Sequence, residues 1–267
     1  MKSTRANGIT IAYEDRGSGP PLLLLHGFSL DHSMWAAQVE QLERSYRLIV
    51  PDLRGLGKTE KSSQPFSVAD MADDAAALLE AIDIPAAAAA GFSLGGYVLA
   101  QLLVRHPLKV RAAAFVSTQA GADTTERAEA RAKTMRFVVD EGIEAFAEAF
   151  IPQLFYPEYT SSHPEEIAQT RGAIEGQRPA SIALLLGAMR EREDMSPYLK
   201  EVNQPCAVIG GADDALVSPQ AMRDLQEGLP DCTIELIDGV GHMSTVEAPE
   251  IVSAELDRLM RRAGMWM

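Results

Sequence analysis

The stretch that decides the fold is Gly91-Phe92-Ser93-Leu94-Gly95, because of the two segments that it joins. Residues 86–90 before it form a short apolar run, and residues 96–103 after it have the composition of a buried helix. A strand that runs directly into a helix leaves one side chain, here Ser93, exposed on a sharp turn above the sheet. The two flanking glycines have no Cβ, so the arms of the turn can approach closely. In this context the G-x-S-x-G pattern indicates a serine nucleophile.

A serine nucleophile needs a base to take its proton and an acid to orient that base. In a sheet of this kind the three residues follow in the order serine, acid, histidine. Of the five histidines, only His242 lies downstream, near the C-terminus, in a glycine-rich loop that follows the apolar run 234–237. The sequence therefore predicts that His242 is the general base for Ser93.

Two neighbouring aspartates are candidates for the acid. Asp213 and Asp214 both follow the apolar run 205–209, and the carboxyl end of a strand is where open α/β sheets place functional groups. We interpret Asp214 as the residue that accepts a hydrogen bond from the histidine Nδ1 and fixes its tautomer. Asp213 is interpreted as a loop carboxylate that caps backbone amides, with the reverse assignment as the alternative.

Two backbone amides complete the predicted chemistry. The run Leu22-Leu23-Leu24-Leu25 is typical of a central parallel strand, and it ends in His26-Gly27-Phe28. Acyl transfer passes through an oxyanion that preorganised donors must stabilise. We predict that the N–H groups of Leu94 and Phe28 supply these donors. His26 is predicted to hold its loop by hydrogen bonds and to take no part in the chemistry.

Five motifs together resemble those of the α/β-hydrolase superfamily, and they occur in its order over nearly the whole chain: LLLLHGF (22–28), VPDLRGLGKTEKS (50–62), GFSLGG (91–96), GADDALVSP (211–219) and GVGHM (239–243). Within the superfamily the chain looks most like small carboxylesterases and 3-oxoadipate enol-lactonase-like members. Leu56 and Ser218 depart from the usual pattern, where a polar residue and a proline are common. The resemblance implies a serine hydrolase that cleaves a small carboxylic ester or lactone through an acyl-enzyme, without a cofactor.

Three alternatives keep the same site. Enol-lactone hydrolysis would need a cationic group for the substrate carboxylate, and Arg136, Arg171 and Arg190 are candidates. A perhydrolase or cofactor-free haloperoxidase would use peroxide in place of water at the acyl-enzyme. A different class is a catalytically slow hydrolase-fold binding protein that retains the pocket. A serine in the pentapeptide, where an aspartate could stand, argues against haloalkane dehalogenase and epoxide hydrolase chemistry.

Alternating apolar runs and helical patterns predict a doubly wound, mostly parallel sheet of eight strands with an inserted helical cap. Strands are expected at 2–6, 9–14, 22–25, 46–50, 86–90, 112–116, 206–209 and 233–237. From about residue 120 to residue 200 no strand pattern appears, and helices are expected at 130–139, 143–150 and 179–192. The predicted core is therefore residues 1–119 and 201–267, and the predicted cap is residues 120–200.

Composition excludes several functional classes. A chain of 267 residues with 46% hydrophobic content can bury one sizeable core. The formal net charge of −14 argues against nucleic acid as a partner, because phosphate binding requires a basic surface. No apolar run reaches the roughly 20 residues that span a membrane, and the N-terminus lacks the apolar segment of a signal peptide. We therefore expect a cytoplasmic protein.

Two residue pairs are interpreted as structural. Asp52 and Arg54 follow a strand, and we predict a salt bridge between them that shapes the pocket rim. Cys206 and Cys232 stand at the starts of two strands, and free thiols are expected for a cytoplasmic protein, with a disulfide as the alternative. The cysteines and histidines show no metal-ligand spacing, so no metal site is predicted.

Overall fold

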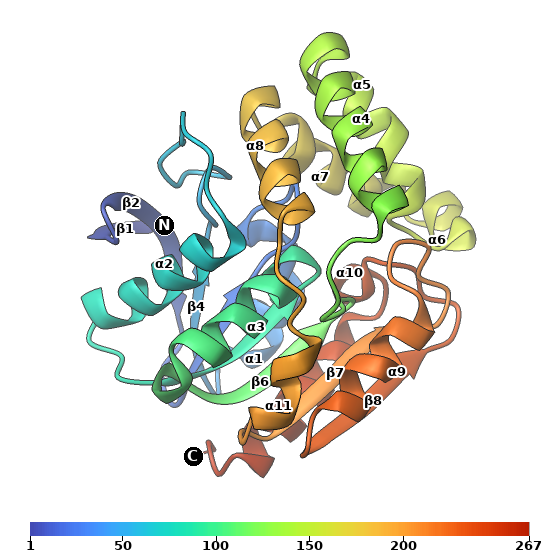
Figure 1. The fold of residues 1–267 in the computed structure, drawn as a ribbon. Coiled ribbons are helices and arrows are strands. Elements are labelled where there is room, and N and C mark those ends of the chain that lie inside the picture. Colours follow the sequence, from blue (N-terminus) through green and yellow to red (C-terminus); the bar gives the residue numbers. More distant parts are fainter. Residues whose placement is uncertain (267) are drawn as a thin grey trace.

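The computed structural model describes residues 1–266, and within this range the centre of the molecule is one eight-stranded sheet (Figure 1). The strand order is β1-β2-β4-β3-β5-β6-β7-β8. The pairs β1–β2 and β2–β4 are antiparallel, and every pair from β4 to β8 is parallel. The strands are β1 (Lys2–Ala6), β2 (Ile9–Arg16), β3 (Pro21–Leu25), β4 (Arg47–Pro51), β5 (Ala87–Phe92), β6 (Val110–Val116), β7 (Cys206–Gly211) and β8 (Cys232–Ile237). The predicted doubly wound, mostly parallel sheet is confirmed.

Helices cover both faces of the sheet. In Figure 1 α2, α3 and α9 lie in front of the strands, whereas α1 and α11 pack together behind them. These helices are α1 (Ala36–Leu42), α2 (Val68–Ala81), α3 (Leu94–Arg105), α9 (Pro219–Gly228) and α11 (Pro249–Arg262). A capping box starts α2: the Ser67 side chain accepts from the Asp70 N–H, and the Asp70 carboxylate accepts from the Ser67 N–H.

Alanine fills the centre of the sheet where longer side chains are usual. Residues 87–90 of β5 lie beside residues 112–114 of β6, and all of them are buried. Alanine has a low intrinsic preference for strands, but strand preference is set largely by packing against neighbours. Because these positions lie between helices on both faces, burial decides their conformation.

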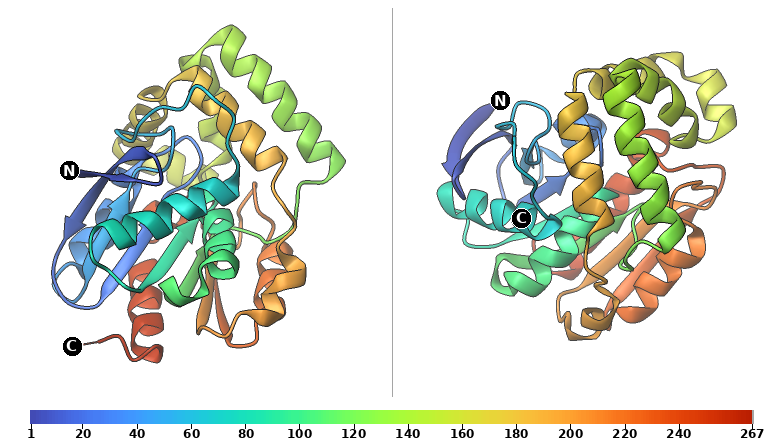
Figure 2. Two further views of the ribbon diagram at one scale, coloured as in Figure 1. Left: turned by 60° about the vertical axis from the view of Figure 1, so that its left-hand side comes forward. Right: turned by 45° about the horizontal axis from the view of Figure 1, so that its top comes forward.

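Further helices lie above the carboxyl ends of the strands, at the top of Figure 1, and Figure 2 shows them from two other sides. They are α4 (Thr125–Glu141), α5 (Ile143–Phe150), α6 (Pro157–Ser162), α7 (Pro164–Glu175) and α8 (Pro179–Arg190), and α4 packs along α8. Helices were expected at the places of α4, α5 and α8. The sequence did not reveal α6, which is short, or α7, which buries only Thr170 and Ile174 and therefore shows little periodicity. The boundaries of a core and a cap stay a prediction.

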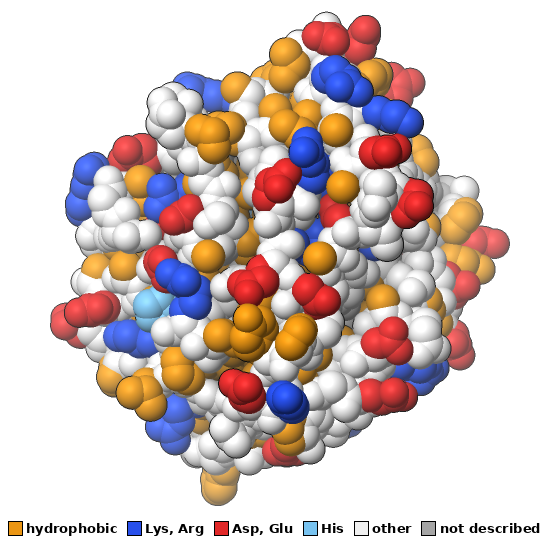
Figure 3. Space-filling model, viewed as in Figure 1, with side chains coloured by type: hydrophobic (Ala, Val, Ile, Leu, Met, Phe, Trp, Pro, Cys, Tyr) orange, Lys and Arg blue, Asp and Glu red, His pale blue; other side chains and the backbone are white. Residues whose placement is uncertain are grey.

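Charged side chains of both signs are mixed on the surface of the molecule. Figure 3 shows acidic and basic side chains interspersed on one face, so the net charge of −14 is not gathered there into a single patch. Within residues 1–266 no helix has both the length and the apolar character needed to cross a membrane.

Cys206 and Cys232 stand opposite each other on β7 and β8, and both are free thiols.

Candidate active site

Ser93 stands between the end of β5 and the start of α3, with φ of 51° and ψ of −111°. A non-glycine residue with positive φ is strained, and such strain is common where a side chain must be held out for chemistry. A Cβ at Gly91 would lie 2.2 Å from the Gly95 carbonyl oxygen, and a Cβ at Gly95 would lie 2.2 Å from the Leu25 carbonyl oxygen. Both positions therefore exclude any side chain, and the start of α3 rests directly against the end of β3.

The structure brings Ser93, His242 and Asp214 into one hydrogen-bonded chain. The His242 Nε2 atom lies 3.0 Å from Ser93 Oγ, and its Nδ1 atom lies 2.7 Å from Asp214 Oδ2. The other carboxylate oxygen of Asp214 accepts from the N–H groups of Leu216 and Val217, at 2.8 and 2.9 Å. With Nδ1 donating to the carboxylate, Nε2 is free to accept the serine proton. The arrangement can deprotonate Ser93.

Asp213 and Asp214 have different environments. The Asp214 side chain is 0% exposed, and the adjoining His242 side chain is 3% exposed. Asp213 is exposed, and its Oδ2 accepts from the Gly239 N–H at 2.9 Å. The geometry thus favours Asp214 as the orienting acid, and Asp213 caps a loop amide.

The two predicted oxyanion donors lie in the loop after β3 and at the start of α3. Within residues 1–266 neither the Phe28 N–H nor the Leu94 N–H donates to a protein acceptor. The Phe28 ring is held edge-on by Phe146 and Phe150 of α5, with ring centroids 5.9 and 5.8 Å away. The two amides are therefore available to a ligand, and their role as an oxyanion hole stays a prediction.

His26 holds the loop that carries Phe28. Its Nδ1 donates to the Gly27 carbonyl and its Nε2 accepts from the Leu53 N–H, both at 2.9 Å. The ring is fully buried, and this burial lowers the pKa of His26, which favours the neutral form needed to accept. The side chain holds its own loop by hydrogen bonds, as the sequence predicted, and also joins it to the loop after β4.

The predicted salt bridge between Asp52 and Arg54 is wrong. Arg54 instead forms an ion pair with Asp74 of α2 at 2.5 Å. Asp52 accepts from the N–H and the ring Nδ1 of His32, at 2.9 and 2.7 Å, and from the Lys58 N–H at 2.7 Å. Asp52 and Arg54 stand two positions apart in the irregular loop after β4, so their closeness in sequence did not indicate their partners.

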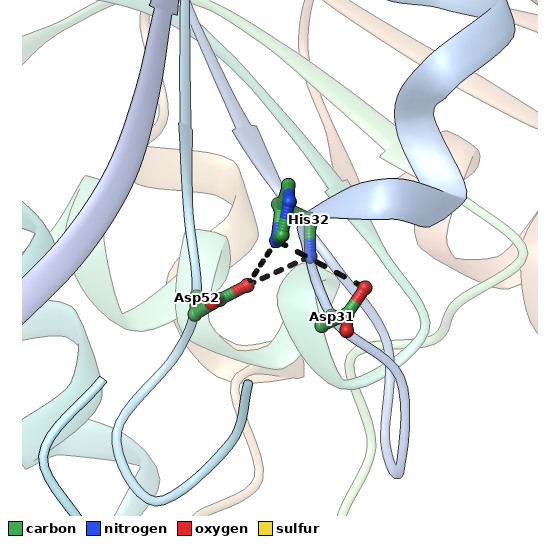
Figure 4. Close-up of side chains that lie close together, drawn as sticks. All are labelled: Asp31, His32 and Asp52. Atoms are coloured by element: carbon green, nitrogen blue, oxygen red, sulfur yellow. Dashed lines mark hydrogen bonds and ion pairs between the residues drawn. The ribbon is translucent and has the colours of Figure 1, made fainter. Parts of the chain in front are cut away.

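Asp31, His32 and Asp52 form a cluster that Figure 4 shows in close-up. One ligand atom from each lies within 4.8 Å of the others, which is close enough to share a metal ion. However, the facing atoms of His32 and Asp52 already share a hydrogen bond, and Asp31 accepts from the Ser33 N–H and hydroxyl. Hydrogen bonds alone account for the cluster, which anchors the chain after the Phe28 loop.

His32 is expected to make the stability of the protein depend on pH. The hydrogen bond to Asp52 raises the pKa of His32 above its ordinary value of about 6.5. A group whose pKa is raised by folding stabilises the folded state fully at pH values below its pKa in the unfolded chain. This stabilisation is lost as pH rises through its pKa in the folded protein. We therefore expect the unfolding free energy of the wild type, relative to His32→Asn, to fall as pH rises from about 6.5 through the raised pKa of His32. Urea titrations of both proteins measure this difference, and a constant difference across that range would contradict it.

A cavity of about 520 Å³ opens beside Ser93 and His242. Its walls come from the loop after β3, from the start of α3, and from α4, α5 and α8. Most of the lining is apolar, including Phe28, Phe137, Phe146 and Phe150. Leu154, Leu186 and Met189 also line this cavity. The site can hold an apolar group against the serine hydroxyl.

The cavity also has cationic residues that sequence reasoning missed. Arg127, Arg131 and Lys133 of α4 line it, and within residues 1–266 no aspartate or glutamate does. The arginines proposed from sequence lie elsewhere: Arg136, Arg171 and Arg190 are not among the lining residues, and the last two pair with Glu175 and Glu191. The turn of α4 that faces the cavity could not be known without the position of that helix.

Comparisons with known proteins agree with the fold. The sequence model of the alpha/beta hydrolase fold family matches residues 20–249. The 3-oxoadipate enol-lactonase 2 of Acinetobacter baylyi is 26% identical over 96% of this chain and 93% of its own length. A malate-bound thermophilic esterase from Thermogutta terrifontis is 31% identical, with a TM-score of 0.95 over 98% of this chain and 99% of that one.

A third relative shows how widely activity varies on this fold. The bromoperoxidase from Bacillus anthracis superposes with a TM-score of 0.88 over 97% of this chain and all of its own, but at 22% identity this likeness shows the fold alone. Fold does not determine substrate, which depends on the residues of the site. The extent of the family match and of the esterase similarity shows that this chain belongs to the α/β-hydrolase family.

Proposed function

We propose that the protein is a serine hydrolase that cleaves carboxylic esters through an acyl-enzyme. The observation that supports this most strongly is the chain from Asp214 through His242 to Ser93, with contacts of 2.7 and 3.0 Å, at the wall of an apolar cavity. The same three residue types in this arrangement support acyl transfer on unrelated folds. The similarity to an esterase along almost the whole chain adds to the proposal.

In the proposed reaction Ser93 Oγ attacks the ester carbonyl while its proton passes to His242 Nε2. The N–H groups of Phe28 and Leu94 hold the resulting oxyanion. The tetrahedral intermediate collapses, the alcohol leaves with the proton from His242, and an acyl group stays on Ser93. Water then attacks this acyl group, with His242 as base, and releases the acid. Asp214 keeps the imidazole in one orientation and tautomer throughout.

Turnover of p-nitrophenyl esters from acetate to octanoate tests this proposal. The purified protein is expected to release p-nitrophenol catalytically and to react with a fluorophosphonate at the same serine. Absence of both reactions would contradict a hydrolase and favour the reading of the chain as a binding protein. Reaction with the fluorophosphonate without ester turnover would restrict the proposal to a specialised substrate.

The charge of the cavity favours one narrower candidate, an ester or lactone whose acid part carries a second carboxylate. Asp123 pairs with both Arg131 and Arg192 and lies 3.9 Å from Arg127, so one negative charge faces several positive ones. Arg127 donates to the Gln119 side chain and the Leu216 carbonyl, both neutral acceptors. An excess of cations in a partly enclosed cavity attracts an anionic group. The relatives named as an enol-lactonase and as malate-bound support testing acidic substrates.

Arg127→Gln is expected to lower activity on acidic esters selectively. Removal of one charge-assisted hydrogen bond, worth about 1.5–3 kcal/mol, should reduce kcat/KM for p-nitrophenyl hydrogen glutarate by about tenfold or more. The value for the neutral p-nitrophenyl butyrate should change by less than about threefold. Arg136→Gln, on the same helix but outside the cavity, is the matched control and should leave both values near those of the wild type. An equal loss on both esters in Arg127→Gln would contradict a carboxylate subsite.

A further inference from the structure

Glu247 ends the short helix α10 (Ser244–Glu247), and its carboxylate joins two stretches that are distant in sequence. Its Oε2 atom accepts from the Tyr156 N–H at 2.8 Å and from the Gly241 N–H at 3.1 Å. Tyr156 belongs to the covering stretch, which we define as residues 154–156, between α5 and α6. Gly241 directly precedes His242. One carboxylate oxygen thus connects the covering stretch to the residue that directly precedes the proposed base, His242.

A hydrogen bond and a close contact join the same two regions. The Met243 N–H donates to the Leu154 carbonyl at 2.9 Å. A Cβ at Gly241 would lie 2.5 Å from the backbone nitrogen of Tyr156, so the covering stretch rests directly on this glycine. His242 is therefore flanked by two residues bound to the covering stretch, one directly and the other through the carboxylate.

The Glu247 carboxylate depends on these contacts. Burial raises the pKa of Glu247, and the N–H groups of Tyr156 and Gly241 act against this by favouring the charged form. Its Oε1 atom is buried and has no hydrogen-bond partner within residues 1–266. A partly buried carboxylate is costly unless donors satisfy it, so the two N–H groups are the main compensation for its position.

We propose that Glu247 is a positioning residue that holds His242 at its working distance from Ser93. Proton transfer needs the two heavy atoms within about 2.6–3.2 Å, and His242 Nε2 stands 3.0 Å from Ser93 Oγ. A misplacement of about 1 Å can cost about 100-fold in rate. Because Leu154 of the covering stretch also lines the cavity, the carboxylate and the Met243–Leu154 hydrogen bond connect one wall of the cavity to the proposed base. This role rests on the proposed function, since Glu247 acts only through His242.

Glu247→Ala is expected to lower kcat for p-nitrophenyl butyrate by about 10- to 100-fold with KM within about twofold of wild type. The rate constant for inactivation by a fluorophosphonate should fall by the same factor, because this reaction needs the Ser93–His242 contact but no bound acyl chain. Glu247→Gln keeps an oxygen that can accept from both N–H groups, and it should restore kcat to within about threefold of wild type.

Two further variants serve as control and independent test. Tyr159→Phe removes a hydrogen bond of 3.1 Å from the hydroxyl to the Val246 carbonyl, which joins α6 to α10 without reaching His242. Its kcat should equal that of the wild type. If Glu247→Ala fails to fold, Tyr156→Pro breaks the same bridge from the other side, because proline has no N–H and Tyr156 already has a φ of −61°. It should show the same loss of kcat with Glu247 intact.

The results separate the positioning role from the proposed function. Wild-type kcat and inactivation rate in folded Glu247→Ala, with only a lower Tm, would show a structural role and overturn the positioning role. Equal losses of kcat in Tyr159→Phe and Glu247→Ala would overturn the positioning role too. Loss of a contact that does not reach His242 would then lower kcat as much as loss of the carboxylate. If the wild-type protein neither turns over esters nor reacts with the fluorophosphonate, both proposals fail.

Discussion

Ser93→Ala is expected to abolish ester turnover, with kcat at least about 10⁴-fold below wild type. The alanine cannot form an acyl-enzyme, and the remaining oxyanion donors and cavity contacts support only slow attack by water. The Ser93 carbonyl keeps its hydrogen bonds from the Thr118 hydroxyl and the N–H groups of Gly96 and Tyr97. The fold should therefore survive, and steady-state kinetics on p-nitrophenyl butyrate measures the effect.

Circular dichroism and the Tm of Ser93→Ala provide the control for this result. A folded variant with activity near that of the wild type would remove Ser93 from the mechanism. Other buried hydroxyls, such as the mutually hydrogen-bonded Ser117 and Ser244, would then need testing. Loss of both activity and structure would assign the effect to the turn, whose backbone is strained at this position.

Asp214→Asn is expected to lower kcat by about 10⁴-fold, the loss seen when a triad acid can no longer fix the histidine tautomer. The two oxygens of Asp214 have different partners, and these partners decide how an asparagine amide would be oriented. Its Oδ1 accepts from the Leu216 and Val217 N–H groups, so an asparagine would keep its carbonyl oxygen there. Its NH₂ group would then face His242 Nδ1, and the ring would carry its proton on Nε2. A protonated neutral Nε2 cannot accept from Ser93.

Asp213→Asn is the matched control, because it changes the neighbouring carboxylate in the same way. An asparagine oxygen can still accept from the Gly239 N–H, so kcat should stay within about threefold of wild type. The pair of variants is measured at one pH with the same ester. A large loss in Asp213→Asn and a small one in Asp214→Asn would reverse the assignment of the acid.

Local signals predicted the sheet and the residues that the structure brings together around Ser93. The glycines around Ser93 mark a turn that no other residue could form, and Leu22–Leu25 marks a central strand through its apolar run. The loops that carry Asp214 and His242 each follow a recognisable strand, and parallel strands bring their carboxyl ends to one edge. Short-range patterns therefore sufficed for the part of the site that the sheet positions.

Residues positioned by helix packing could not be predicted in this way. Arg127 and Arg131 face the cavity because α4 packs along α8 with one particular side turned toward it. The sequence of α4 does not reveal this side, because its apolar face is weak and Val138 is its one buried residue. Glu247 acts through backbone amides of Gly241 and Tyr156, and such contacts leave no side-chain pattern. The pairing of Arg54 with Asp74 likewise depends on where α2 crosses the loop after β4.

Site-specific labelling shows whether Ser93 is an activated nucleophile. The wild-type protein is treated with a fluorophosphonate, digested and mapped by mass spectrometry, with Ser93→Ala in parallel. We expect one adduct per chain, on the peptide that contains Gly91–Gly95 and at Ser93 itself, and no adduct in the variant. An adduct on another residue, or no adduct on a folded wild-type protein, would contradict the role of Ser93 as the nucleophile.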